Sequence, residues 1–296
     1  MLRFIRLLTI AIAGCTVLGL LVILIIESPV ARARVTSVLG SCPFDRIREG
    51  QDIVRQFRQT RKAMQERSHK VRRDGKFELW STPQGEFWYP GPFTDLDAFV
   101  LAEEEFDIYR TYRIKPGAFV LDCGANVGTF TRRALNRGAA KVIAIEINPD
   151  SAEALRRTFA KEVGEGRVVV YPKGVWYKDA ELDLHGDSVV LPHEGATKRL
   201  PLTTMDHIVS ELQLSSVDFI KMDIEGAEKN ALRGGQATLV KFSPVMALSA
   251  EHLPDDMTSI PALVSELVPG RYQMVFGLCV FTGLLHAVPN VLHFSK

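Results

Sequence analysis

The segment LDCGANVGTF, from Leu121 to Phe130, decides the fold of this chain. It follows the apolar run Ala118–Val120 and precedes residues 131–135, which are typical of a helix. A strand, a glycine-rich turn and a helix N-terminus, in that order, form an element that cradles the polar part of a nucleotide. The segment therefore predicts a ligand site at the carboxyl end of a buried strand.

A second strand-like run, Lys141–Ile145, ends at Glu146, where a carboxylate can accept both hydroxyl protons of a ribose. The turn carries Asp122 and only two glycines, Gly124 and Gly128, whereas dinucleotide sites use three glycines. A carboxylate beside the turn repels a diphosphate but suits a ligand with an ammonium and a sulfonium group. We therefore predict S-adenosylmethionine as the cofactor; the alternative is a turn that needs glycine only for its backbone conformation.

Two blocks carry a resemblance to a known family. The turn resembles the first motif of class I methyltransferases, and its form DxGANxG is similar to that of the FkbM-type methyltransferases. The segment VDFIKMDIEGAE, residues 217–228, is similar to a second stretch of that family. The resemblance covers about residues 100 to 296 and implies methyl transfer to oxygen, but a shared fold does not name the acceptor.

From residue 118 onward, strands and helices alternate, which predicts an α/β fold with a mostly parallel sheet and helices on both faces. Seven strands in this order resemble the Rossmann-like class I methyltransferase fold. The last two apolar runs, residues 272–281 and 285–294, predict a hairpin that supplies an antiparallel edge strand. A helix is also expected over residues 227–240.

Ligands of such sheets bind at the carboxyl ends of the strands. We expect the backbone at Gly124, Asn126 and Gly128 to contact the methionine part of the cofactor, with Asp122 organising the turn. Glu146 is expected to hold the ribose. Trp176, which follows the third strand, is the candidate to stack on the adenine, although a tryptophan at a sheet edge also serves packing alone.

Three further residues are candidates for catalysis: Asp223 and Glu225 after the fourth strand, and His252 after the fifth. His252 can take the proton of an acceptor hydroxyl, because an ordinary histidine pKa lies near neutrality. Asp223 is expected to contact cofactor or acceptor, and Lys221 to be its partner by strand alternation. Glu228 suits the first turn of a helix, and no metal ion is predicted.

Residues 7–26 form an uncharged apolar segment about as long as a bilayer is thick, so we predict a transmembrane helix. The alternatives are a cleaved signal peptide and a buried helix. Arginines after the segment outnumber those in the flank of residues 1–6, which places residues 114–296 in the cytoplasm as the methyltransferase domain of a single-pass membrane protein.

Between these parts, residues 27–76 are predicted to form a basic juxtamembrane stalk, with thirteen Lys and Arg against six Asp and Glu from Ala31 to Trp80. A short coiled coil or a helix on anionic lipid is the alternative. Residues 77–113 read as a hairpin and helix that cap the domain. The four cysteines lie far apart and indicate no disulfide framework, which is typical of a reducing compartment.

The sequence thus favours a membrane-anchored methyltransferase that uses S-adenosylmethionine to methylate a small molecule, a saccharide or a lipid-linked acceptor. Nucleic acid is not expected as a partner, since no aromatic residues interleave the basic stretch. Two other functions stay open at this point. One is an NAD(P)-dependent oxidoreductase on a similar fold, and the other is a non-catalytic membrane scaffold.

Overall fold

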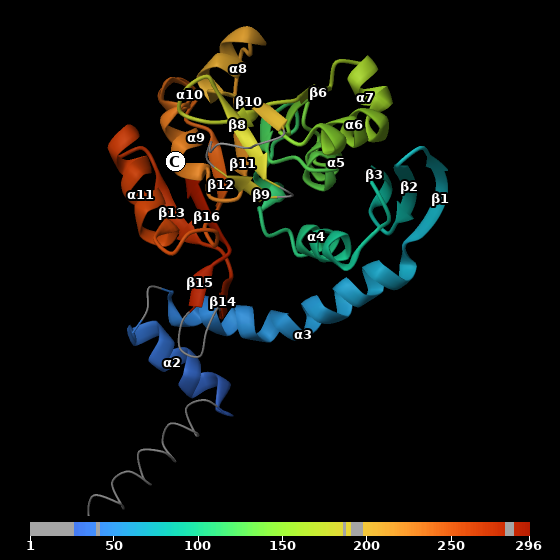
Figure 1. Ribbon diagram of the computed structural model, residues 1–296. Helices are drawn as coiled ribbons and strands as arrows, with labels where there is room; N and C mark the ends of the chain where they lie inside the picture. Colours follow the sequence, from blue (N-terminus) through green and yellow to red (C-terminus); the bar gives the residue numbers. More distant parts are fainter. Residues whose placement is uncertain (1–26, 40–41, 186–187, 191–197, 282–286) are drawn as a thin grey trace, which may run out of the picture.

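The apolar strands at the centre of the sequence assemble into one seven-stranded sheet (Figure 1). The computed structural model describes residues 27–39, 42–185, 188–190, 198–281 and 287–296. The strand order is β13-β16-β12-β11-β4-β5-β6. The bounds are β4 Phe119–Cys123, β5 Lys141–Ile145, β6 Val168–Tyr171, β11 Phe219–Met222, β12 Val245–Ser249, β13 Gln273–Phe276 and β16 Val291–Ser295.

Helices cover both faces of this sheet, as the alternation of elements predicts. One hydrophobic cluster joins Val120, Val142 and Ala144 to residues of α4, α5 and α6. The other joins Leu121 and Ile143 to α8, α9, α10 and α11. Neighbouring strand residues therefore pack on opposite faces. The helix bounds are α4 Asp95–Glu105, α5 Thr129–Asn136, α6 Pro149–Thr158, α7 Ala160–Gly164, α8 Met205–Glu211, α9 Glu228–Arg233, α10 Gln236–Phe242 and α11 Asp256–Leu267.

Two predicted details of this region are wrong. β16 is antiparallel to both β12 and β13, so the antiparallel strand lies inside the sheet and β13 occupies the edge. The helix expected over residues 227–240 is two helices, because the chain breaks at Gly234 and Gly235. A Cβ on Gly234 would overlap the carbonyl of Trp176, so this break lets the helices pack close to the strand-end loops.

A second sheet of four strands, in the order β7-β10-β8-β9, follows β6 and is absent from the prediction. Its strands are β7 Gly174–Val175, β8 Ala180–His185, β9 Ser188–Val190 and β10 Lys198–Thr203. β10 pairs in parallel with β7 at Leu202 and Gly174. This pairing brings β7, and with it Trp176, to the carboxyl ends of the central strands.

The N-terminal part packs against the central domain instead of forming a free stalk. Helix α2 spans Pro29–Leu39 and α3 spans Phe44–Arg67. Figure 1 shows α3 extending from the C-terminal strands past α4 to β1. Phe57 of α3 packs its ring against Phe99 and Phe106. The prediction of a stalk separate from the domain therefore needs correction, because α3 packs on α4.

The hairpin predicted near residue 80 is present, and a third strand joins it. β2 Phe77–Thr82 and β3 Gly85–Tyr89 pair in antiparallel register, and β1 His69–Asp74 adds to β2. The alternation of apolar and polar residues is weak in β1, whose side chains are all exposed. Phe87 and Trp88 of β3 are buried in the same cluster as α5 and α6, so this small sheet is part of the main hydrophobic core.

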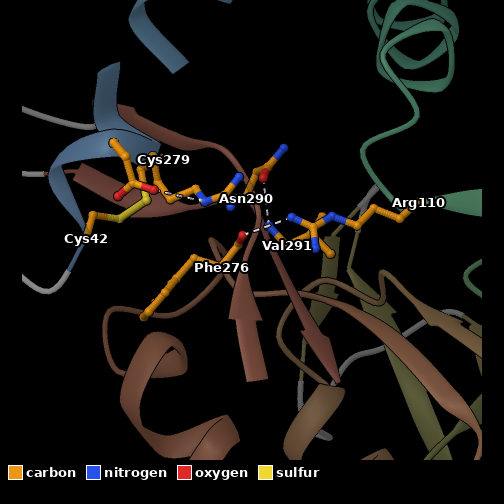
Figure 2. Close-up of a disulfide and its surroundings, with 8 residues drawn as sticks. Cys42, Arg110, Phe276, Cys279, Asn290 and Val291 are labelled. Carbon is orange, nitrogen blue, oxygen red and sulfur yellow. Dashed lines mark hydrogen bonds and ion pairs between the residues drawn. A yellow bond between two sulfur atoms is a disulfide. The ribbon is translucent and has the colours of Figure 1, made fainter. Parts of the chain in front are cut away.

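A disulfide joins the start of α3 to the C-terminal strands (Figure 2). Cys42 bonds to Cys279 in β14 Cys279–Phe281, which pairs with β15 Ala287–Pro289. Nearby, the Arg110 guanidinium donates a hydrogen bond to the carbonyl of Phe276 at 3.2 Å. The expectation that no disulfide forms is wrong, because a contact between residues 237 positions apart leaves no local pattern in the sequence.

The membrane predictions also need correction. Across the described ranges, no helix combines the length and apolar character required to cross a membrane. The proposed span at residues 7–26 lies outside those ranges. The transmembrane helix and the single-pass location are therefore not carried further.

Candidate functional site

A cavity of about 1030 Å³ opens at the carboxyl ends of the central strands. Its walls include Gly124 and Asn126 after β4, Glu146 after β5, Trp176 after β7 and Asp223 after β11. Parallel strands bring their carboxyl ends to one edge, so residues far apart in the sequence meet here. Four of the six predicted cofactor residues, Gly124, Asn126, Glu146 and Trp176, line this single cavity.

The turn after β4 needs its glycines for reasons of geometry. Gly124 has φ +79° and Gly128 has φ +96°, values that favour glycine. A Cβ on Gly124 would overlap the carbonyl of Asp223, so glycine lets β4 and β11 approach each other at the cavity. A Cβ on Gly128 would overlap Phe159 and Leu155, so Gly128 packs against α6 and does not line the cavity.

Asp122 lies beneath the turn and is fully buried. It accepts a hydrogen bond from Thr131 Oγ1 at 2.6 Å, and its Oδ1 lies 3.4 Å from Lys221 Nζ. Lys221 Nζ also donates to the carbonyl of Gly124 at 2.6 Å. Burial disfavours the charge on Lys221, but Asp122, Asp223 and Glu104 outweigh it and raise the pKa of Lys221. Asp122 and Lys221 therefore hold the turn from beneath. Lys221 contacts Asp122, whereas strand alternation predicts that it is the partner of Asp223.

Glu146 connects the two strand ends that border the cavity. Its Oε2 accepts the backbone N–H of Asn126 at 2.8 Å, and its Oε1 accepts that of Asn148 at 2.7 Å. Burial raises the pKa of Glu146, while these backbone hydrogen bonds act to lower it. Each oxygen keeps a second lone pair, so the carboxylate can still accept two ribose hydroxyls at the cavity wall.

The predicted catalytic residues form one cluster around His252. Its Nε2 lies 3.3 Å from Asp223 Oδ1 and 3.6 Å from Glu225 Oε2. Its Nδ1 lies 3.0 Å from Oε1 of Glu228, which is fully buried. Burial acts to lower the pKa of His252, but the hydrogen bond to Glu228 and the charges of Glu228, Asp223 and Glu225 raise it to about 9.

This charge state changes the expected chemistry of the cluster. A pKa raised to about 9 favours the protonated form of His252 at neutral pH, whereas the predicted role of His252 as a proton acceptor requires its neutral form. Asp223 and Glu225 both line the cavity and hold a carboxylate beside the imidazolium, and Asp223 is the less exposed of the two, with its side chain 32% exposed against 82% for Glu225. Asp223, Glu225 and His252 each offer a ligand atom within 4.8 Å of the others, a spacing that can accommodate a metal ion.

Sequence reasoning missed two residues of this cluster. Glu228 reads as a helix-dipole residue, yet its carboxylate accepts the Ile224 backbone N–H at 2.9 Å and orients His252. The repeated acidic residues of the stretch 223–228 were the available signal. The Tyr109 hydroxyl donates a hydrogen bond to Asp223 Oδ2 at 2.8 Å. Tyr109 lies 114 residues from Asp223, and no local pattern connects the two.

Known proteins resemble the part of the chain that builds this site. Residues 122–270 match the family model described as the methyltransferase FkbM domain. The 2-O-methyltransferase NoeI of Sinorhizobium fredii (strain NBRC 101917 / NGR234) is 30% identical over 149 residues. That match covers 43% of this chain and 61% of the length of NoeI.

Solved structures share less with the chain. The methyltransferase FkbM from Methylobacillus flagellatus KT matches with a TM-score of 0.47 and 17% identity, over 83% of this chain and 60% of that one. SMU.1697c from Streptococcus mutans, in complex with SAH, matches with a TM-score of 0.41 and 10% identity, over 65% of this chain and 95% of that one. These scores are too low to support an argument, so the assignment rests on the sequence match. That match includes both the turn after β4 and the acidic stretch after β11, and this chain belongs to the FkbM methyltransferase family.

Proposed function

We propose that this protein transfers the methyl group of S-adenosylmethionine to a hydroxyl group of an acceptor bound in the same cavity. The observation that carries the proposal is the single cavity lined by the turn after β4, by Glu146 and by Asp223. The relative NoeI is named a 2-O-methyltransferase, which supports an oxygen acceptor. A saccharide or another small hydroxylated molecule is the corresponding substrate class.

The residues on the cofactor side fit S-adenosylmethionine. Gly124 and Asn126 line the cavity, Glu146 keeps acceptor positions for a ribose, and Trp176 lines the cavity with a ring suited to the adenine. The cofactor, when bound, supplies an electrophilic methyl group on a sulfonium. In-line displacement needs alignment above all, and a cavity with walls from four strand ends supports such an alignment of two ligands.

The acidic cluster accepts the proton that leaves the acceptor hydroxyl. We assign proton acceptance to Asp223, because its carboxylate lies at the cavity and His252 beside it already carries a proton. The imidazolium and the Tyr109 hydroxyl fix the two oxygens of Asp223 from different sides. Glu228 in turn holds the ring of His252, so it is a positioning residue.

Calorimetry with S-adenosylhomocysteine tests the cofactor half of this proposal. The wild type should bind it, and Glu146→Ala should weaken binding at least about tenfold, since two hydroxyl acceptors are lost. Glu165→Gln, an exposed position after α7, is the matched control and should bind as the wild type. Absence of S-adenosylhomocysteine binding by the intact wild type would overturn the proposal.

The catalytic half is tested by transfer of a labelled methyl group to a panel of saccharides. Asp223→Asn should bind S-adenosylhomocysteine like the wild type yet transfer methyl groups at least about 100-fold more slowly, as expected for loss of a proton acceptor. Transfer by this variant at the wild-type rate would remove Asp223 from the mechanism.

A further inference from the structure

Helix α4 and the segment after it supply a wall of the cavity that the cofactor proposal leaves unassigned. The lining residues from this wall are Leu96, Asp97, Val100, Glu103, Glu104 and Tyr109. Within α4 they recur at intervals of three and four, so one face of the helix borders the cavity. We call these six residues the α4 wall. Glu105, the next residue of the helix, is exposed.

The α4 wall meets the reacting end of the cavity at Tyr109. This side chain is 5% exposed, and its hydroxyl donates to Asp223 at 2.8 Å. The charge of Asp223 also acts on Glu103, as does that of Glu251. A group bound against the α4 wall therefore lies beside the carboxylate that receives the acceptor proton.

Glu104 is a buried acid of this wall, and Glu103 beside it is half-buried. Glu104 is 2% exposed, and its Oε2 has no hydrogen-bond partner among the described residues. Burial, with the charges of Asp223, Glu251 and Glu104, raises the pKa of Glu103 to about 9. Burial raises the pKa of Glu104 to about 8, although Lys221 and Arg133 oppose this rise. At neutral pH each carboxyl group can thus both donate and accept a hydrogen bond.

Carboxyl groups outnumber cations at this end of the cavity. Asp97, Asp223 and Glu225 line it together with Glu103 and Glu104, and the ring of His252 lies 3.3 Å from Asp223. Lys221 also lines the cavity, but its Nζ is already engaged by Asp122 and the carbonyl of Gly124. An anionic acceptor would meet repulsion here, whereas hydroxyl or ammonium groups would find partners. Glu104 Oε2 has no hydrogen-bond partner among the described residues, and a hydroxyl or ammonium group of a ligand would supply one.

We propose that the α4 wall is the acceptor site, that it takes a polyhydroxylated compound without negative charge, and that Glu103 and Glu104 hold groups next to the methylated hydroxyl. This inference rests on the proposed methyl transfer and names its substrate class. A neutral sugar and an amino sugar are polyhydroxylated and carry no negative charge. A uronic acid carries a carboxylate and does not fit.

The test uses the full chain saturated with S-adenosylhomocysteine and three probes of one size: glucose, glucosamine and glucuronate. Saturation-transfer NMR and calorimetry should detect glucose and glucosamine, with glucuronate at least about tenfold weaker. Binding of glucuronate as tight as that of glucose, or binding of none of the probes, would overturn the proposal.

Variants of the two acids sharpen the test. Glu103→Ala and Glu104→Ala should weaken the binding of both glucose and glucosamine. Glu105→Ala on the same helix should change the binding of neither. Glu104→Gln, which keeps a donor and an acceptor, should retain glucose binding, as expected if the protonated carboxyl group acts through hydrogen bonds. Unchanged binding of glucose and glucosamine in both alanine variants would contradict the proposed acceptor site. Binding of S-adenosylhomocysteine by the wild type is measured in parallel. Its absence would contradict the cofactor proposal and is thus distinguished from a failure of the acceptor site.

Discussion

Replacing His252 by glutamine should make the free energy of unfolding depend less on pH. The pKa of His252 rises from 6.5 to about 9 because Glu228, Asp223 and Glu225 outweigh its burial. A rise of this size corresponds to about 3 kcal/mol, and the partial exposure of the ring reduces the net contribution to about 2 kcal/mol. This stability is fully present below pH 6.5 and is lost as the pH rises through about 9.

The measurement is urea-induced unfolding of the wild type and His252→Gln at about pH 6 and about pH 10. The wild type should exceed the variant by about 2 kcal/mol more at the lower pH than at the higher. His69→Gln, at an exposed position of β1, is the control and should show no such difference.

The same reasoning predicts the source of the raised pKa. Glu228→Gln keeps an oxygen that can accept from the imidazole but removes the negative charge, so the pKa of His252 should fall by about 1 to 2. Proton–nitrogen NMR titration of the ring measures this value directly. If His252→Gln loses equal stability at both pH values, or if Glu228→Gln leaves the pKa unchanged, the assignment of Asp223 as proton acceptor loses its basis.

Three further outcomes follow from the fold. Gly124→Ala should lower the free energy of unfolding by more than about 3 kcal/mol in a thermal unfolding assay, because a Cβ there overlaps the Asp223 carbonyl. The control Gly75→Ala, in open space at φ +59°, should lower it by about 1 kcal/mol in the same assay. Reduction of the Cys42–Cys279 bond should cost about 2 to 5 kcal/mol in urea unfolding, and peptide mapping without reductant should recover the linked pair with Cys123 free. Lys221→Met should cost about 3 to 5 kcal/mol by leaving Asp122 buried and unpaired, and the double variant Asp122→Asn with Lys221→Met should recover part of this loss.

The sequence identifies the parts of the site that local chain order creates. A strand, a tight turn and a helix follow one another around Gly124, and a second strand ends at Glu146, so these positions can be read without a structure. The same holds for Asp223, which directly follows the apolar strand β11. Each of these residues owes its place to neighbours within a few positions of the chain.

The remaining features depend on contacts between distant segments. Tyr109 reaches Asp223 only because α4 packs over the sheet edge, and Cys42 meets Cys279 only because α3 crosses the C-terminal strands. The raised pKa of His252 depends on Glu228, which the acidic stretch 223–228 contains but which lies 24 residues from the histidine. Residue type alone suggests an ordinary histidine, and the three surrounding carboxylates change that expectation.

The position of β16 has a consequence for synthesis of the chain. The strand β16, Val291–Ser295, follows the other central strands in the sequence, yet it pairs with β12 on one side and β13 on the other. Until translation reaches these residues, β13 has no place in the central sheet. A premature stop before Val291 would therefore remove β16 and leave β13 without its pairing to the central sheet.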